Sequence, residues 1–102
     1  MNHSNADLWL LVLKEDELKF EDIKKTINQI SESGKFDYDT GKGKHAIFHM
    51  ILSDLDMLCQ SGYAIRTFEK ENKTEIVEKF RITPKGMARA ERLLSISRGH
   101  RK

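Results

Sequence analysis

The spacing of apolar residues along the chain predicts four helices and one β-hairpin. The first helix is indicated by an apolar run of six residues that follows Ser4 and Asp7, a capping residue and an early acid, which predicts a helix near residues 5–14. Because this run is apolar on nearly every side, either the rest of the domain covers it or part of it, such as Trp9, packs on a partner chain.

Two further helices are predicted by apolar residues that recur every three or four positions. In residues 21–33 these positions are Ile23, Ile27 and Ile30, and in residues 44–61 they are Ile47, Ile51, Leu55 and Leu58. Gly34 can close the earlier helix in the left-handed conformation. The polar loop over 35–43 predicts no regular element, and a short strand at 18–20 is compatible with the pattern.

Residues 63–69 and 75–82 are rich in β-branched and aromatic side chains and are joined by a polar segment, which predicts a β-hairpin. One face of the second strand carries the apolar residues Ile76, Phe80 and Ile82. Lys79 and Arg81 fall on the opposite face, so we expect a sheet that is wet on one side.

Thr83 and Pro84 form a strong helix start, because the threonine hydroxyl can cap the first turn and proline loses no hydrogen bond there. We expect this last helix to run to about Ile96. Residues 97–102 are then expected to form a frayed, basic tail.

Composition limits the class of protein. A chain of 102 residues, 38% hydrophobic and 33% charged, suits a single domain over residues 1–102. The apolar run near the N-terminus is too short to cross a bilayer, and no Lys or Arg precedes it as in a signal peptide, which favours a cytoplasmic protein without membrane contact. The lone Cys59 excludes an intrachain disulfide, and its apolar neighbours predict a buried thiol.

The net charge of +2 does not identify a nucleic-acid binder, but its distribution is uneven. Residues 1–40 carry five lysines against nine acids, whereas residues 71–102 carry nine basic residues against four acids. This asymmetry favours a surface with two differently charged sides, one of which could face phosphate.

Together these elements predict an α+β fold, mostly α, with a three-helix core, a two-stranded hairpin and a C-terminal helix. Residues 52–63 (LSDLDMLCQSGY) and 80–86 (FRITPKG) lie on either side of the hairpin. They resemble the end of the recognition helix and the exit from the wing in the winged-helix superfamily, with the spacing of MarR-type and PadR-type regulators. Winged helices also serve as protein-interaction modules, so this resemblance does not decide function.

The resemblance implies two groups of DNA-contacting residues. In that family the third helix enters the major groove by its N-terminal half, and the corresponding residues here are Lys42, Lys44, His45, Phe48 and His49. The wing contacts a flanking backbone or minor groove, and its residues here are Arg66, Lys70, Asn72 and Lys73. The loop before the third helix is far longer than the usual turn, and the reading helix lacks arginine, so phosphate binding is favoured over readout of base sequence.

Other chemistries are weakly indicated. His45 and His49 are four residues apart, a spacing that can place two imidazoles on one metal ion, with Cys59 as a further ligand. Two independent solvent-facing histidines are the commoner outcome, so no metal and no cofactor is assigned. The acids at 15–17 and 21–22 are explained by helix starts and solvation, and no catalytic set is recognisable, so we expect no enzyme.

Two structural alternatives stay open. Apolar residues of the first and last helices form either a homodimer interface or the packing of one helix on the other within the chain; they are Leu8, Trp9, Leu13, Met87, Leu94 and Ile96. Phe36 and Tyr38 either stack on a base or ligand, or fold back over the core.

The expected function is that of a transcriptional regulator that binds double-stranded DNA as a homodimer. The alternative is a winged-helix module that binds protein and not DNA, which the modest net charge and the acids Asp54 and Asp56 favour. A metal-sensing or small-molecule-sensing repressor would depend on His45, His49 and Cys59 alone.

Overall fold

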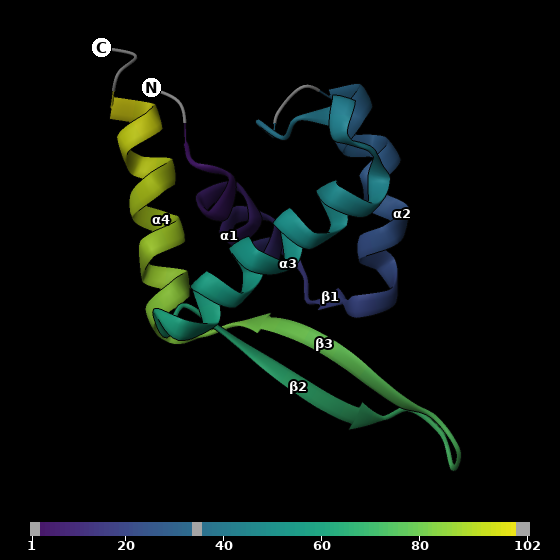
Figure 1. Cartoon of the computed structure of the whole chain (residues 1–102). Helices are drawn as coiled ribbons and strands as arrows, with labels where there is room; N and C mark the ends of the chain where they lie inside the picture. Colours follow the sequence, from purple (N-terminus) through teal and green to yellow (C-terminus); the bar gives the residue numbers. More distant parts are fainter. Residues whose placement is uncertain (1–2, 34–35, 100–102) are drawn as a thin grey trace.

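The computed structural model describes residues 3–33 and 36–99, with side chains except at 28–33, 40 and 97–99. Over these residues the chain is an α+β fold with four α-helices and a three-stranded antiparallel sheet (Figure 1). The elements are α1 (Asn5–Glu15), β1 (Leu18–Lys19), α2 (Phe20–Ser33), the 3-10 helix η1 (Thr40–Lys42), α3 (Lys44–Gln60), β2 (Ala64–Lys70), β3 (Ile76–Ile82) and α4 (Pro84–Gly99). The expected helices and strands are confirmed, with ends that differ by at most three residues.

Two segments differ from the sequence expectation. The loop before α3 contains η1, because the backbone carbonyl of Asp39 accepts a hydrogen bond from the Lys42 amide at 3.3 Å and the Asp39 side chain accepts one from the Gly41 amide at 3.0 Å. The last helix continues to Gly99, beyond the expected end at Ile96. Residue 34, the expected stop of α2, and tail residues 100–102 lie outside the described part of the chain.

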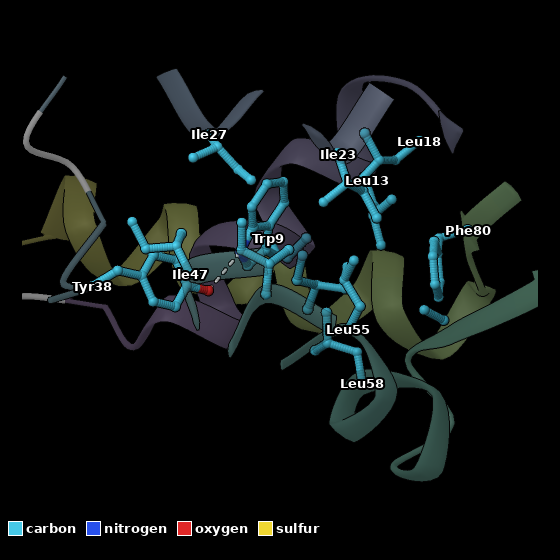
Figure 2. Close-up of a cluster of buried hydrophobic side chains, with 14 of the residues drawn as sticks. Trp9, Leu13, Leu18, Ile23, Ile27, Tyr38, Ile47, Leu55, Leu58 and Phe80 are labelled. Carbon is cyan, nitrogen blue, oxygen red and sulfur yellow. Dashed lines mark hydrogen bonds between the residues drawn. The ribbon is translucent and has the colours of Figure 1, made fainter. Parts of the chain in front are cut away.

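The core lies where α1, α2 and α3 meet the sheet (Figure 2). Its largest fully buried side chains are Trp9, Leu10, Leu13, Ile23, Ile47, Ile51 and Leu55. Most occupy the positions that the helical periodicity predicted, and each contributes about 1.5–3 kcal/mol by leaving water. Trp9, Leu10 and Leu13 of the apolar run in α1 are therefore covered by the rest of the domain, which for Trp9 is the first of the two alternatives, whereas Val12 in the same run is 39% exposed.

The sheet has three strands, and not the two of the expected hairpin, because β1 pairs with β3 on the side away from β2. The face toward the helices is closed near the helices by Leu18, Ala64 and Phe80, which are buried. Ile76 shares that face as expected, but it is 68% exposed because the outer half of the hairpin extends beyond the helices (Figure 1).

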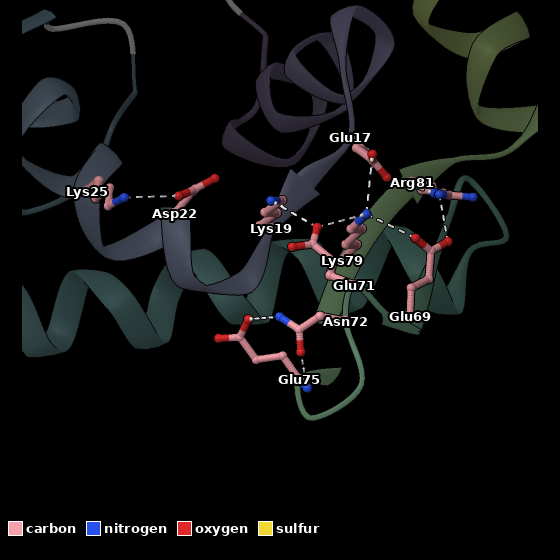
Figure 3. A network of polar contacts seen from close by, with 10 residues as sticks. All are labelled: Glu17, Lys19, Asp22, Lys25, Glu69, Glu71, Asn72, Glu75, Lys79 and Arg81. Atoms are coloured by element: carbon pink, nitrogen blue, oxygen red, sulfur yellow. Dashed lines mark hydrogen bonds and ion pairs between the residues drawn. The ribbon is translucent and has the colours of Figure 1, made fainter. Parts of the chain in front are cut away.

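The opposite face of the sheet is not uniformly exposed to solvent. Lys79 is only 7% exposed, which contradicts the expectation for this residue. Its ammonium lies 3.0 Å from a Glu69 carboxylate oxygen and 3.6 Å from oxygens of Glu17 and Glu71 (Figure 3). Three carboxylates thus replace the water that a lysine on an open sheet face would have.

The same carboxylates bind two more cations. Arg81 donates to Glu17 at 2.9 Å and to Glu69 at 2.6 Å, and Lys19 lies 3.1 Å from Glu71. The resulting network joins the segment after α1, strand β1 and both strands of the hairpin, and Figure 3 shows it as one connected cluster. It anchors the hairpin to the N-terminal part of the chain.

A second anchor holds the start of α4 against the turn that follows α3. The Thr83 hydroxyl accepts a hydrogen bond from the Gly86 amide at 3.0 Å and donates to the Gly62 carbonyl at 2.7 Å, while the Thr83 amide donates to the Tyr63 carbonyl at 3.1 Å. A Cβ added to Gly86 would lie 1.9 Å from that carbonyl oxygen of Tyr63. The predicted cap is confirmed, and the glycine three residues after it is required by this close approach.

Replacement of Gly86 by alanine is expected to lower the free energy of unfolding by about 1–3 kcal/mol, because the backbones must separate to admit the methyl group. Urea unfolding followed by circular dichroism measures this change. Gly41→Ala is the matched control: there the new methyl meets only the exposed Asp39 side chain at 3.2 Å. Equal stability of the two variants would contradict the close contact.

The free energy of unfolding is expected to fall at acid pH because the carboxylates of Glu17 and Glu71 become protonated. A hydrogen bond from Arg81 lowers the pKa of the Glu17 carboxyl, and one from Lys19 lowers that of Glu71. Their contribution is complete above the ordinary value of 4.5 and is lost as pH falls through the lowered folded-state pKa values. Melting temperatures measured down to about pH 3 should show a shallower acid decline in Glu71→Gln than in the parent. The exposed Glu91, which has no partner among the described residues, gives the control Glu91→Gln; an equal change in both variants would contradict the network.

Candidate nucleic-acid interface

The loop that leads into α3 is held by a buried chain of hydrogen bonds. The Trp9 indole donates to the Tyr38 hydroxyl at 2.8 Å, and that hydroxyl donates to an Asp54 carboxylate oxygen at 2.5 Å (Figure 2 shows the first of these). Burial, together with the Asp54 carboxylate, raises the pKa of Tyr38, so the phenol remains a donor. Asp54 is therefore half-buried and directed at Tyr38, whereas Asp56, the other acid of the protein-binding alternative, is exposed.

The aromatic residues of this loop fold back over the core. Tyr38 is buried, and the Phe36 ring lies 4.8 Å from the Trp9 ring and 5.9 Å from the Tyr38 ring, centroid to centroid. The Asn5 side chain donates to the Asp37 carbonyl at 2.9 Å and accepts from the Asp37 amide at 2.7 Å. These contacts confirm the fold-back alternative for both aromatic residues and position the chain just before α3.

Helix α3 begins in an open, cationic setting. Gly43 precedes it with a φ of 92°, which favours glycine, and no side chain caps the first turn. Lys42, Lys44 and His45 are exposed there, and neither lysine has an ion-pair partner in the described part of the chain. Uncapped backbone amides and free ammonium groups form a favourable environment for an anion.

The next turn of α3 brings two histidines together and directs Phe48 toward α2. His45 and His49 are exposed, with their Nε2 atoms 3.1 Å apart. Phe48 is half-buried, with its ring edge-on to Phe20 at 5.7 Å and under the Lys24 ammonium at 5.8 Å. Phe48 thus packs toward α2 and is a poor candidate for groove contact. Lys24, which the sequence reasoning missed, lies on the polar side of the α2 periodicity and adds a cation beside α3.

The hairpin candidates divide into paired and free cations. Arg66 donates to Glu78 at 2.6 Å and lies over the Phe80 ring, so its charge is balanced within the hairpin. Lys70 and Lys73 are exposed and have no ion-pair partner among residues 3–33 and 36–99. Of the predicted wing cations, only these two keep an unbalanced charge near the tip.

Asn72 has a structural role in the hairpin turn. Its side-chain oxygen accepts hydrogen bonds from the amides of Thr74 and Glu75, both at 2.9 Å, and its side-chain nitrogen donates to the Glu75 carboxylate at 3.0 Å. The turn therefore uses part of the hydrogen-bonding capacity of Asn72, and its contact with DNA stays a prediction.

Two hollows border the hairpin. One of about 390 Å³ lies between α3 and the hairpin and is lined by His49, Leu52, Ser53, Asp56, Arg66 and Phe80. One of about 220 Å³ lies between the start of α2 and the outer hairpin and is lined by Phe20, Glu21, Glu71, Glu75, Ile76, Val77 and Glu78. Four glutamates line the second hollow, and two of them, Glu71 and Glu78, are paired with cations.

The predicted dimer interface is wrong for two of its residues. Trp9 is 1% exposed and Leu13 is 2% exposed within the single chain, which leaves them no surface for a partner. Asp7 on α1 accepts a hydrogen bond from Arg89 on α4 at 3.1 Å, in keeping with packing of the first helix on the last. Leu8, Met87 and Leu94 are only partly buried and keep some exposed surface.

The described residues contain no group of three or more His, Cys, Asp or Glu side chains that could hold a metal ion. Cys59 is partly buried, and desolvation raises the pKa of its thiol. Within residues 3–33 and 36–99, none of the helices has the length and apolarity needed to span a bilayer.

Comparison with protein-family models, curated protein sequences and solved structures finds no match for the chain.

Replacement of Tyr38 by phenylalanine tests the buried chain of hydrogen bonds. It leaves the Trp9 indole N–H without its acceptor and Asp54 without its donor, so we expect a loss of about 1–3 kcal/mol in the free energy of unfolding. Urea unfolding followed by tryptophan fluorescence measures it. The control is Tyr63→Phe, because the Tyr63 hydroxyl has no hydrogen bond to another described residue; a larger loss in that variant would speak against the assignment.

Proposed function

We propose that this chain is a winged-helix domain that binds duplex DNA without catalysis, as a regulator. Three helices followed by a hairpin and a fourth helix form the order that the resemblance led us to expect, and β2 and β3 supply the wing. In this proposal, α3 enters the major groove by its N-terminal half and the wing tip contacts a flanking phosphate backbone.

The observation that carries the proposal is the distribution of unpaired cations. Lys79, Arg81 and Arg66 in the hairpin are each neutralised by glutamates. Of the residues predicted to contact DNA, the lysines without an ion-pair partner in the described part of the chain lie at the start of α3 and at the hairpin tip: Lys42, Lys44, Lys70 and Lys73. Lys14, Lys24 and Lys85 also lack a carboxylate partner among the described residues and lie on α1, α2 and α4. Ammonium groups without an internal partner release phosphate counterions on binding, which is the main source of affinity for DNA.

The arrangement of the elements supports joint contact. Figure 1 shows α3 and the hairpin diverging from a common corner beside α4, so that the start of α3 and the hairpin tip both point away from α4. A duplex on that side would meet free lysines at two separated places. The exposed face of α3 carries no arginine, so binding is expected to depend mainly on phosphates and little on base sequence.

We further propose that the regulator acts as a homodimer, which would present two α3 helices to successive major grooves. Its interface would have to use Leu8, Met87, Leu94 and Ile96, because Trp9 and Leu13 are buried in the monomer whereas Ile96 is 42% exposed. Sedimentation equilibrium would measure this state directly.

A second candidate function, protein binding, is favoured by one observation. Phe68 and Ile76 lie on the same face of the outer hairpin and are 65% and 68% exposed, beside the acidic hollow at the start of α2. An apolar pair bordered by glutamates suits a basic, apolar protein segment better than it suits phosphate.

Exchange of Lys44 and Lys70 for glutamate is expected to weaken binding to a labelled mixed-sequence duplex by roughly tenfold or more. Measured by fluorescence anisotropy between about 50 and 200 mM salt, the slope of log K against log salt should become shallower by about 2, since each lost phosphate contact accounts for about 0.9.

The matched control is Lys14→Glu with Arg92→Glu, which makes the same change in net charge on α1 and α4. It should retain most of the affinity and the parent slope. An equal loss in both pairs, or a parent affinity insensitive to salt, would contradict the proposed contacts. Phe68→Ser with Ile76→Ser should leave duplex binding intact; abolition of binding to a protein partner by that pair, with no duplex binding in the parent, would establish the second candidate.

A further inference from the structure

The histidine pair on α3 has a geometry that the sequence alone could not give. The Nε2 atoms of His45 and His49 lie 3.1 Å apart, the ring centroids are 4.5 Å apart, and the ring planes are nearly perpendicular at 87°. Both side chains are exposed. Two nitrogens this close cannot both direct a proton at each other, so they share one hydrogen bond or one cation between them.

The separation matches the bite of a metal ion. A zinc–imidazole bond is about 2.0–2.1 Å long, so two nitrogens on one ion lie about 3.3 Å apart at the tetrahedral angle and about 2.9 Å apart at a right angle. The observed 3.1 Å lies between these values. Residues four apart on one helix hold this spacing without any movement of the backbone.

We propose that His45 and His49 bind a divalent transition-metal ion of the class preferred by imidazole, such as Zn²⁺, Ni²⁺ or Cu²⁺. Hard ions such as Mg²⁺ and Ca²⁺ prefer oxygen ligands and are not expected. No third His, Cys, Asp or Glu of the described residues completes the site, so water or an external ligand fills the remaining positions. The ion is therefore exchangeable and does not hold the fold together.

Neighbouring charges limit the affinity of this site. Lys44 is adjacent in sequence, and the Lys24 ammonium lies over Phe48, whose ring centroid is 6.0 Å from that of His49. Both cations oppose a bound metal. Asp56 lines the same hollow as His49, and its negative charge favours a bound metal ion. We expect binding that is saturable yet much weaker than at a four-ligand zinc site.

The site lies on the half of α3 that the proposed function assigns to DNA, and this part of the inference rests on that proposal. A bound divalent ion would add positive charge beside Lys44 and offer open positions to a phosphate oxygen. Zinc is then expected to strengthen duplex binding several-fold in the parent and not in a variant without the pair.

The test is a titration of the full chain, without an affinity tag, with ZnCl₂ in a non-chelating buffer. Calorimetry gives the affinity and the imidazole resonances give the location. The parent should bind one ion and shift the signals of both histidines. His45→Gln and His49→Gln should each bind at least tenfold more weakly, with unchanged circular dichroism because both positions are exposed. The control His3→Gln with His100→Gln should bind as the parent does.

A rescue variant tests whether zinc binding requires two histidines four residues apart, and not merely His45 itself. His45→Gln with Ser53→His removes one partner and places a new one on the exposed position four residues after His49, so binding should return. Absence of heat and of imidazole shifts in the parent overturns the inference, as does binding that survives in both single variants.

Duplex binding is measured separately with and without zinc. If the chain binds zinc but no duplex, the metal site is supported and the proposed function is overturned. If the chain binds duplex but gives no heat and no imidazole shift with zinc, the proposed function is supported and the metal site is overturned.

Discussion

The contact between the backbone of Gly86 and the carbonyl of Tyr63 determines how the rest of the molecule is arranged. Strand β2 begins directly after the turn that closes α3, and β3 ends directly before α4 begins, so both ends of the hairpin meet at this contact. Hydrogen bonds from Thr83 to Gly62 and Tyr63 close the gap between them. Protein interiors pack too tightly to leave room for a side chain at such an approach. Gly86 therefore sets the direction in which the hairpin leaves α3. Any contact that α3 and the hairpin share with a long ligand depends on this direction.

Charge pairing on the sheet explains where free charge remains. Lys19 lies directly opposite Lys79 across β1 and β3, a placement that is unfavourable for like charges unless something neutralises them. Glu71 contacts both ammonium groups, and Glu69 takes a second contact with Lys79. Ion pairs of this kind add little net stability, because desolvation offsets their attraction. Their consequence here concerns charge: Lys19, Lys79 and Arg81 are neutralised by glutamates of the same network. Lys70, at the end of β2, has no such partner among the described residues and keeps its charge.

Much of the fold could be predicted from local pattern, whereas the interactions that define the surface could not. Helical periodicity located α2 and α3, and the hydroxyl–proline pair located the start of α4, because these signals act within a few residues. The burial of Lys79 depends on Glu17, far away in sequence, and no pattern within the strand reveals that partner. Asp54 has the spacing of a solvated helix residue, yet it faces Tyr38 across the long loop. Asn72 shows the same difficulty for the candidate site: its place in a polar turn is compatible both with contact to a ligand and with the hydrogen bonds that it accepts from its own neighbours.

The hydrogen bond from Tyr38 directs Asp54 toward the loop and leaves this acid half-buried. The exposed Lys and Asp side chains of α3 are then Lys44 at its start and Asp56 near its end, on a helix that rises about 1.5 Å per residue. These two charges are therefore about 18 Å apart along the axis, roughly twice the distance over which salt screens a charge at physiological ionic strength. Each end then acts separately on a polyanion: the first turn attracts phosphate and the last turn repels it. A duplex lying along the whole helix would gain nothing from its second half. In the proposed function, a duplex that meets α3 by its N-terminal half and the hairpin by its tip contacts Lys42, Lys44, Lys70 and Lys73, and this is the approach that these four charges favour.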